Sequence, residues 1–318
     1  MYVIRDIWGN KIQPKEIKLF LFADERKRVK VRGRDERWDY LCLLVIPSNK
    51  IDAAIEILEH HRGEVEYFEE LRFREINKKA KGKKFELAKR WLEEIIEDGK
   101  QGRGIFYFSI LGIDKNKLDF SCFGEGDSPK GKYANVYNRF FRTNFLSTIK
   151  SFFDEYDSII VERIFHDREG NLEQHEYFNW HLIWKVEREE ERIFFASDKI
   201  IFVESDHRKE KNFPWASHFI QLADILVGSV SYCMELSNPR HKGQKELAKV
   251  MLPLVEKLVY RADNKNSRFG YFKKYKLAFF PKTEKREELP NQVYTKRDLA
   301  LLDEVSKQLK LPLVIQES

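Results

Sequence analysis

Four acidic residues of this sequence stand in segments that are otherwise largely apolar. Asp24 ends the run LFLFAD, and Asp167 ends the run IIVERIFHD. Glu70 lies inside YFEELRF, and Asp224 is the only acid in HFIQLADILVGSV, residues 218–230. An ionised carboxylate in an apolar setting is costly unless it is paired, hydrogen-bonded or bound to a cation. One cation site shared by all four acids would explain them together.

A hard divalent cation, Mg²⁺ or Mn²⁺, suits such a set of ligands. Clustered carboxylates repel one another, which raises their pKa values, and a divalent ion supplies the positive charge that keeps them ionised. Both ions prefer oxygen ligands and keep several waters, which leaves room for substrate phosphates. Two such ions about 3.5 to 4 Å apart can hydrolyse a phosphodiester bond, one by activating water and the other by stabilising the leaving oxygen.

The elements that must position these acids follow a mixed α/β pattern. Residues 16–25 and 158–167 are predicted to be buried strands, and each ends in one or two acids. Ligand sites gather at the carboxyl ends of strands in open α/β sheets. Residues 218–230 are predicted to be an apolar helix that packs on the sheet. Further strands are predicted at 38–48, 64–73 and 104–114, helices at 50–63, 83–99 and 133–156, and strands or a hairpin at 177–187 and 192–206.

We expect one mixed α/β domain over residues 1–236 and an α-rich, basic C-terminal extension over 237–318 that packs on it. The extension contains predicted helices at 244–260 and 295–310. Between them, the stretch RFGYFKKYK mixes aromatic and basic residues. Such a stretch is compatible with nucleic-acid binding, but it is more often a strand that buries its aromatic rings.

Four short motifs resemble the family called domain of unknown function 3800 (DUF3800), a branch of the RNase H-like fold. They are FADE at the end of the first strand, ELRF, the acid after a later strand, and IQLADILVG, and together they cover residues 17–235. The corresponding family signatures are Asp-Glu-Ser-Gly, Glu-x-Lys, an isolated Asp and Gln-x-Ala-Asp. The sequence departs from them at Arg26 and Lys27, which replace Ser-Gly, and at Arg72, which replaces the lysine. An arginine keeps the positive charge of lysine but presents it as a planar fork.

This resemblance implies a mixed central sheet flanked by helices and a divalent-metal-dependent nuclease that hydrolyses DNA or RNA. The metal ligands that it implies are Asp24, Glu70, Asp167 and Asp224. In that scheme Asp24 bridges two ions, Asp167 and Asp224 each complete one metal site, and Glu70 binds one ion directly or through water.

Basic residues near these acids are candidates for substrate contacts. Arg72 shares the face of Glu70 if this segment is a strand, and could contact a phosphate oxygen. His166, beside Asp167, could carry a proton near neutral pH. Arg139 and Arg142 on the long predicted helix could bind the phosphates of a nucleic acid.

Each candidate also has a simpler interpretation. Asp224 taken alone would be a buried helix acid paired with an arginine of the core. Glu69 competes with Glu70, and Asp157 or Asp206 competes with Asp167. For Glu25 the simpler interpretation is preferred, because strand alternation points it away from Asp24. At the level of function, the alternatives are a non-catalytic module that binds nucleic acid or protein, and a hydrolase of small phosphates.

Composition sets wider limits on the function. The 318 residues include 58 Lys and Arg against 52 Asp and Glu, so a net charge of +6 permits a polyanionic partner without requiring one. The three cysteines are odd in number and widely spaced, which favours reduced, buried thiols and a cytoplasmic location. We expect neither a leader nor a membrane span, because no apolar run reaches the roughly 20 residues that a span requires. The oligomeric state is left open by the sequence.

Overall fold

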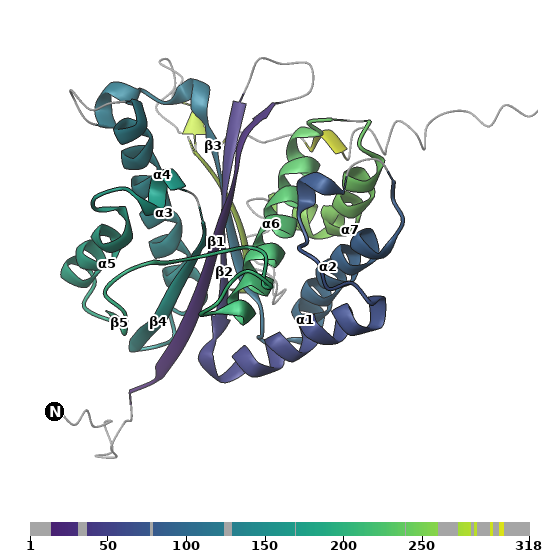
Figure 1. Ribbon diagram of the computed structural model, residues 1–318. Helices are drawn as coiled ribbons and strands as arrows, with labels where there is room; N and C mark the ends of the chain where they lie inside the picture. The colour runs from purple at the N-terminus through teal and green to yellow at the C-terminus, as the bar shows by residue number, and fades with distance from the viewer. Residues whose placement is uncertain are drawn as a thin grey trace, which may run out of the picture.

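A mixed β-sheet forms the middle layer of the protein, and helices cover both of its faces (Figure 1). The computed structural model describes residues 14–30, 37–76, 79–123, 129–168, 170–238, 240–259, 273–280, 283–284, 293–294 and 299–301. Within them the strand order of the main sheet is β5-β4-β1-β2-β3-β7, with β6 also paired to β4. The predicted α/β class, with a mixed central sheet flanked by helices, is confirmed.

The strands are β1 (Glu16–Lys30), β2 (Arg37–Pro47), β3 (Tyr107–Asp114), β4 (Ser158–Asp167), β5 (Ile193–Phe195), β6 (Ile201–Val203) and β7 (Tyr275–Phe280), with a separate pair β8 (Thr283–Glu284) and β9 (Val293–Tyr294). The helices are α1 (Ile51–Val65), α2 (Lys83–Gln101), α3 (Pro129–Phe152), α4 (Gly170–Glu173), α5 (Phe178–Glu189), α6 (Pro214–Glu235) and α7 (Lys242–Val259). Short 3₁₀ turns are η1 (Ser48–Lys50), η2 (Phe73–Glu75), η3 (Lys115–Lys117) and η4 (Phe120–Phe123).

Strands β1, β2 and β3 form an antiparallel meander, and β4 lies parallel to β1. The chain reaches β4 through α3, as a parallel pair requires a crossover connection. Side chains alternate between two cores. Phe22 and Leu44 belong to the core under α1, α2, α6 and α7, while Leu21 and Leu43 belong to the core under α3 and α5. Helices therefore shield both faces of the sheet from solvent, which explains why β1 and β2 contain nearly continuous apolar runs.

Helix α6 is the central helix of the first core. It packs against β1, β2, α7 and α2. A helix that contacts protein on all sides must be apolar all round, which is the pattern of HFIQLADILVGSV. The helix begins with a proline in its first turn, where no backbone hydrogen bond is lost, and it ends at Leu236 in the left-handed conformation.

Two predicted strands are wrong. Residues 64–73 are not a strand, because α1 continues through Gly63 to Val65 and ends at Glu66, whose φ of 53° is left-handed. The chain then forms a loop up to η2, and its apolar side chains pack on α6 instead of alternating across a sheet. Residues 177–187 form the helix α5, whose buried positions recur at helical spacing: Phe178, Leu182, Ile183 and Val186.

The predicted strands at 192–206 are present as β5 and β6, but each pairs in parallel with β4 and not with the other. In the C-terminal extension, α7 packs on α6 and α2, and β7 adds an edge strand to the main sheet beside β3. Tyr275 of RFGYFKKYK is fully buried, as expected for a strand that buries its rings. Most of the predicted helix at 295–310 lies outside the described residues.

Cys42 and Cys233 are buried as expected, whereas Cys122 is exposed. None of the helices in the described part of the chain combines the length and the apolar character that crossing a membrane demands.

Gly228 on α6 permits the closest contact in this core, because a Cβ atom added there would overlap the ring of Phe73. We expect Gly228→Ala to lower the free energy of unfolding by about 2–3 kcal/mol, since η2 must shift to make room. Gly63→Ala on α1 is the matched control, because nothing lies within 4 Å of its added Cβ. That control should be neutral or stabilising by up to about 1 kcal/mol. Chemical denaturation of the two variants measures both effects, and equal stabilities would contradict the packing described here.

Candidate carboxylate site

Strands β1 and β4 are parallel, and β4 ends beside the middle of the longer strand β1, which continues to Lys30. The last pair in register is Ala23 with His166, and each is followed by an aspartate, Asp24 and Asp167. Two residues before each aspartate the rings of Phe22 and Phe165 stack at 5.4 Å, and both belong to the core under α6. Because side chains alternate along a strand, Asp24 and Asp167 also face α6.

Asp224 reaches the same place from α6. Between Ala216 and Glu235 every residue except Asp224 is buried, so this carboxylate lies where the helix opens to solvent. Its Oδ2 atom accepts a hydrogen bond of 2.7 Å from the backbone N–H of Phe73. We call Asp24, Asp167 and Asp224 the acid cluster.

The three carboxylates of the acid cluster influence one another's ionisation. Burial raises the pKa of Asp24 well above its ordinary value, and the charges of Asp167, Asp224 and Glu25 raise it further. Burial, with the charges of Glu25 and Asp224, raises the pKa of Asp167 to about 7. Burial also raises the pKa of Asp224, although the Phe73 N–H and nearby arginines oppose this. Arg72 and the Arg168 N–H oppose the shift of Asp167 as well, whereas none of the described arginines opposes that of Asp24.

Arg26 is one of the arginines that act on Asp224. Its guanidinium donates hydrogen bonds of 3.0 Å to the carbonyl of Gly228 and to Ser231 Oγ, and it lies 5.0 Å from the Phe73 ring centre. Burial lowers the pKa of Arg26, and the charge of Asp224 opposes this shift. Arg26, which stands where the DUF3800 signature has serine, thus supplies a positive charge that acts on Asp224.

Glu70 and Arg72 form the outer part of the site. Arg72 Nε donates to Glu70 Oε1 at 2.5 Å, and Ser205 Oγ donates to the same carboxylate oxygen. The positive charge of Arg72 lowers the pKa values of Asp167 and Asp224, so this guanidinium acts on the acid cluster as well as on Glu70. Glu70 is thus held by an arginine and a serine, and its charge is not among those that raise the pKa of Asp24.

Gln221, one turn before Asp224, fastens the loop that carries Glu70 and Arg72 to α6. Its Oε1 accepts hydrogen bonds from Leu71 N–H at 2.9 Å and from Arg62 at 2.6 Å. Its Nε2 donates to the Ser205 carbonyl at 2.5 Å. The Gln-x-Ala-Asp pattern therefore has a local explanation: residues three apart lie on one face of a helix, and both hold this loop.

His166 does not join the acid cluster. Its ring is fully buried on the other face of the sheet, where Nε2 is 2.6 Å from Tyr137 Oη and 3.6 Å from a Glu25 oxygen. Its Nδ1 lies 2.7 Å from the Asp167 carbonyl oxygen, which only accepts, so Nδ1 carries a proton. The predicted orientation of Glu25 away from Asp24 matches this arrangement.

Arg139 and Arg142 are also separated from the acid cluster. Both belong to α3, which covers the face of the sheet opposite α6 (Figure 1). A sequence pattern that predicts a helix does not show which face of the sheet the helix covers, so it does not show whether these arginines lie near the acids.

The competing acids are engaged elsewhere. Asp157 precedes β4, at the end of that strand opposite Asp167, and accepts from the Lys15 N–H. Asp206 is bound by the Arg208 side chain, and this hydrogen bond lowers its pKa. Glu69 is exposed, whereas the Glu70 side chain is 16% exposed. The geometry therefore favours Asp167 and Glu70 among the alternatives left open by the sequence.

The acid cluster fits Mg²⁺ or Mn²⁺ in donor chemistry, because it offers three hard carboxylate ligands under mutual repulsion. As the side chains stand, no group of three or more His, Cys, Asp or Glu in the described ranges is arranged to hold a metal ion. A cation would therefore have to draw the carboxylates together.

Comparisons with known proteins do not assign the chain to a family: no family model matches it, and no curated protein matches it either.

Ionisation of Asp167 should make the metal-free protein less stable as the pH rises. An unfolded aspartate titrates near 3.8 and the folded one near 7, so the folded chain retains a proton that the unfolded chain loses. The stabilisation from this proton is complete below about pH 4 and lost as the pH rises through about 7. At pH 8 we expect Asp167→Asn to raise the melting temperature above that of the unsubstituted protein by roughly 2 °C or more. At pH 4 we expect no increase.

The measurement is thermal unfolding in a chelator from pH 4 to 8. Asp52→Asn, at an exposed position of α1, is the control. If the melting temperatures of Asp167→Asn and the unsubstituted protein differ by the same amount at every pH in this range, ionisation of Asp167 does not destabilise the fold.

Replacing Gln221 should release the loop before η2. Gln221→Leu leaves the buried Leu71 N–H and the Ser205 carbonyl without partners, and we expect a loss of about 2–4 kcal/mol in the free energy of unfolding. Gln101→Leu on the exposed end of α2 is the control and should change it by less than about 0.5 kcal/mol. Urea denaturation compares the two, and a small effect at both positions would refute the role given to Gln221.

Proposed function

We propose that the protein is a divalent-metal-dependent nuclease of the RNase H-like fold, acting on phosphodiester bonds of DNA or RNA. The observation that carries the proposal is that Asp24 in the middle of β1 and Asp167 at the end of β4 lie on the face of the sheet covered by α6, which carries Asp224. Their repulsion has no structural benefit, because like charges that are buried or half-buried together cost stability. Clustered, perturbed carboxylates in such a place are typical of functional sites.

The order of the elements supports membership of the RNase H-like group and of DUF3800. The resemblance implies acids on a first strand, a middle segment, a later strand and a final helix. Here Asp24 lies on β1, Glu70 on the loop after α1, Asp167 on β4 and Asp224 on α6. The middle position is a loop held by Gln221, and not the strand expected from the sequence.

In the proposed reaction a water oxygen bonds to phosphorus and gives up a proton, the bond from phosphorus to the leaving oxygen breaks, and the leaving oxygen takes up a proton. Bound Mg²⁺ or Mn²⁺ would supply Lewis-acid stabilisation and an activated water. Asp24, Asp167 and Asp224 would hold the ions through oxygen ligands. Arg72 is placed to orient a phosphate oxygen, and Glu70 holds the Arg72 guanidinium in that direction.

One observation favours a second candidate, a non-catalytic module that keeps this fold and binds nucleic acid or protein. Asp224 already accepts the Phe73 N–H and faces Arg26, so part of its charge is satisfied without a cation. Such a module would bind a partner without cleaving it, and would bind divalent ions no better than a surface acid does. Hydrolysis of small phosphates is the further alternative, and it would appear as activity on a phosphomonoester.

The deciding experiment is cleavage of labelled DNA and RNA strands in Mn²⁺ and in Mg²⁺. We expect Asp24→Asn to reduce cleavage by about 100-fold or more, because it removes a charged ligand from the centre of the site. Its stability in a chelator should be equal to or higher than that of the unsubstituted protein, since a buried charge is lost. Asp52→Asn serves as the control and should retain full activity.

Absence of metal-dependent cleavage of any strand, together with normal folding, would favour the binding module. Cleavage that survives Asp24→Asn would place the activity at another site.

A further inference from the structure

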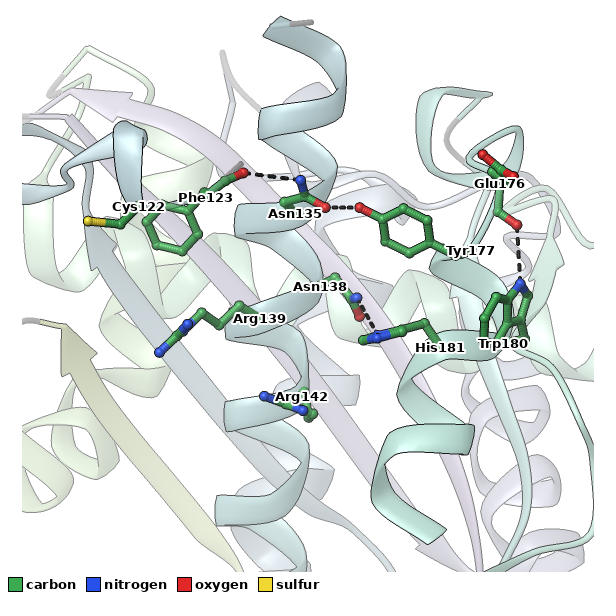
Figure 2. A pocket seen from close by; sticks show the side chains of 10 residues that line it. All are labelled: Cys122, Phe123, Asn135, Asn138, Arg139, Arg142, Glu176, Tyr177, Trp180 and His181. Atoms are coloured by element: carbon green, nitrogen blue, oxygen red, sulfur yellow. Dashed lines mark hydrogen bonds between the residues drawn. The ribbon is translucent and has the colours of Figure 1, made fainter. Parts of the chain in front are cut away.

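A cavity of about 540 Å³ lies between α3 and α5, on the face of the sheet opposite the acid cluster (Figure 2). Arg139, Arg142 and Asn138 line it from α3, and Trp180 and His181 line it from α5. Phe123 of η4 closes one end. The proposed nuclease reaction uses none of these residues. The volume lies within the roughly 300 to 1,000 Å³ that is usual for small-molecule sites.

One wall of the cavity is positively charged. Arg139 and Arg142 are three residues apart, so they project from the same side of α3. Arg139 is exposed and makes no ion pair with any described acid, and its guanidinium lies 6.0 Å from the Phe123 ring. Arg142 has one partner, Glu189, at 3.6 Å, whose side chain is 43% exposed. An exposed pair at this distance is weak, so both guanidinium groups are available to an anion.

The floor of the cavity contains a polar group that lacks a partner. Asn138 is 93% buried, as its relative exposure is 7%, and one end of its amide is 2.9 Å from His181 Nδ1. Its Oδ1 atom is buried and makes no hydrogen bond to the described residues. Either orientation of the amide leaves one end unsatisfied, and buried polar atoms of this kind normally bond to a ligand or water.

The opposite wall is aromatic. The Trp180 side chain is 44% exposed, which is unusual for so large an apolar group, and its Nε1 donates to the Glu176 carbonyl at 3.2 Å. Figure 2 shows this indole on α5, across the cavity from the arginines of α3. A ring that is exposed and also tethered offers a flat surface on which a base can stack, at little cost in side-chain entropy.

We propose that this cavity binds a nucleoside phosphate, with the phosphate between Arg139 and Arg142 and the base against Trp180. The His181 ring then provides a hydrogen bond to the sugar or the base, and the Asn138 amide holds that ring in place. The ligand is either a free nucleotide or one nucleotide of a strand, because the recognised chemistry is the same. The inference does not depend on the proposed nuclease, since the two sites lie on opposite faces of the sheet.

The test is calorimetric titration, in a chelator so that no strand is cut, with AMP, UMP, adenosine, inorganic phosphate and an eight-nucleotide DNA strand. We expect saturable binding of AMP or UMP that is tighter than binding of adenosine or phosphate alone. Arg139→Gln and Arg142→Gln should each weaken it about tenfold, the effect of one charge-assisted contact. Trp180→Ala should weaken nucleotide binding but leave phosphate binding unchanged.

Arg90→Gln on α2, which lies on the other face of the sheet, is the matched control and should not change binding. Tighter binding of the strand than of either mononucleotide identifies a strand as the source, and equal or weaker binding identifies a free nucleotide.

Two results would overturn the inference. One is no binding of AMP, UMP or the strand at several millimolar ligand. The other is binding that is unaffected by Arg139→Gln, Arg142→Gln and Trp180→Ala together. The Asp24→Asn variant separates this site from the nuclease, because it should bind AMP normally while cleavage is lost.

Discussion

The burial of α6 against β1 and β2 is the constraint on which the rest of the structure depends. A helix in contact with protein on every side can tolerate a carboxylate only where its surface opens, and Asp224 occupies that opening. The same packing needs Gly228, because the Phe73 ring lies against the helix backbone there. Phe73 in turn presents its N–H to Asp224. Phe73 thus takes part both in the packing against Gly228 and in the hydrogen bond to Asp224, so a shift of this residue would change both contacts.

Charge balance follows from this packing. Each aspartate of the acid cluster loses hydration where α6 covers the sheet, and the charges of Asp167 and Asp224 also raise the pKa of Asp24. Arg26 on a strand and Arg72 on a loop offset part of this cost. They lower the pKa of Asp224, whereas no arginine in the described part of the chain offsets the raised pKa of Asp24. A divalent cation beside Asp24 would supply the missing positive charge, which links the stability cost to the proposed function.

Much of this site could be predicted from the sequence. The apolar run before Asp167 shows where β4 ends, and alternation fixes the side on which Asp24 and Glu25 lie. The expected end of β1 at residue 25 is wrong, because this strand stays paired with β2 as far as Lys30. The same alternation, applied to β4, would have placed His166 opposite Asp167. The loop after α1 was not predictable in this way, because α1 runs through Gly63 and the apolar residues that follow it pack on a helix instead of pairing. The layer to which Arg139 belongs depends on how α3 crosses the sheet, a tertiary property that no local pattern encodes.

Polar side chains lie on both faces of the sheet at Asp24 and Glu25 of β1 and at His166 and Asp167, which end β4, and this has a consequence for folding. A slip of one residue between paired strands moves every side chain to the other face. Here it would place Glu25 beneath α6 and leave Asp24 facing the Tyr137 hydroxyl and the His166 ring. Both faces would then lose their matched partners at once. Purely apolar strands could accept such a slip by repacking. The polar side chains on the two faces therefore each favour the observed register of β1 with β4.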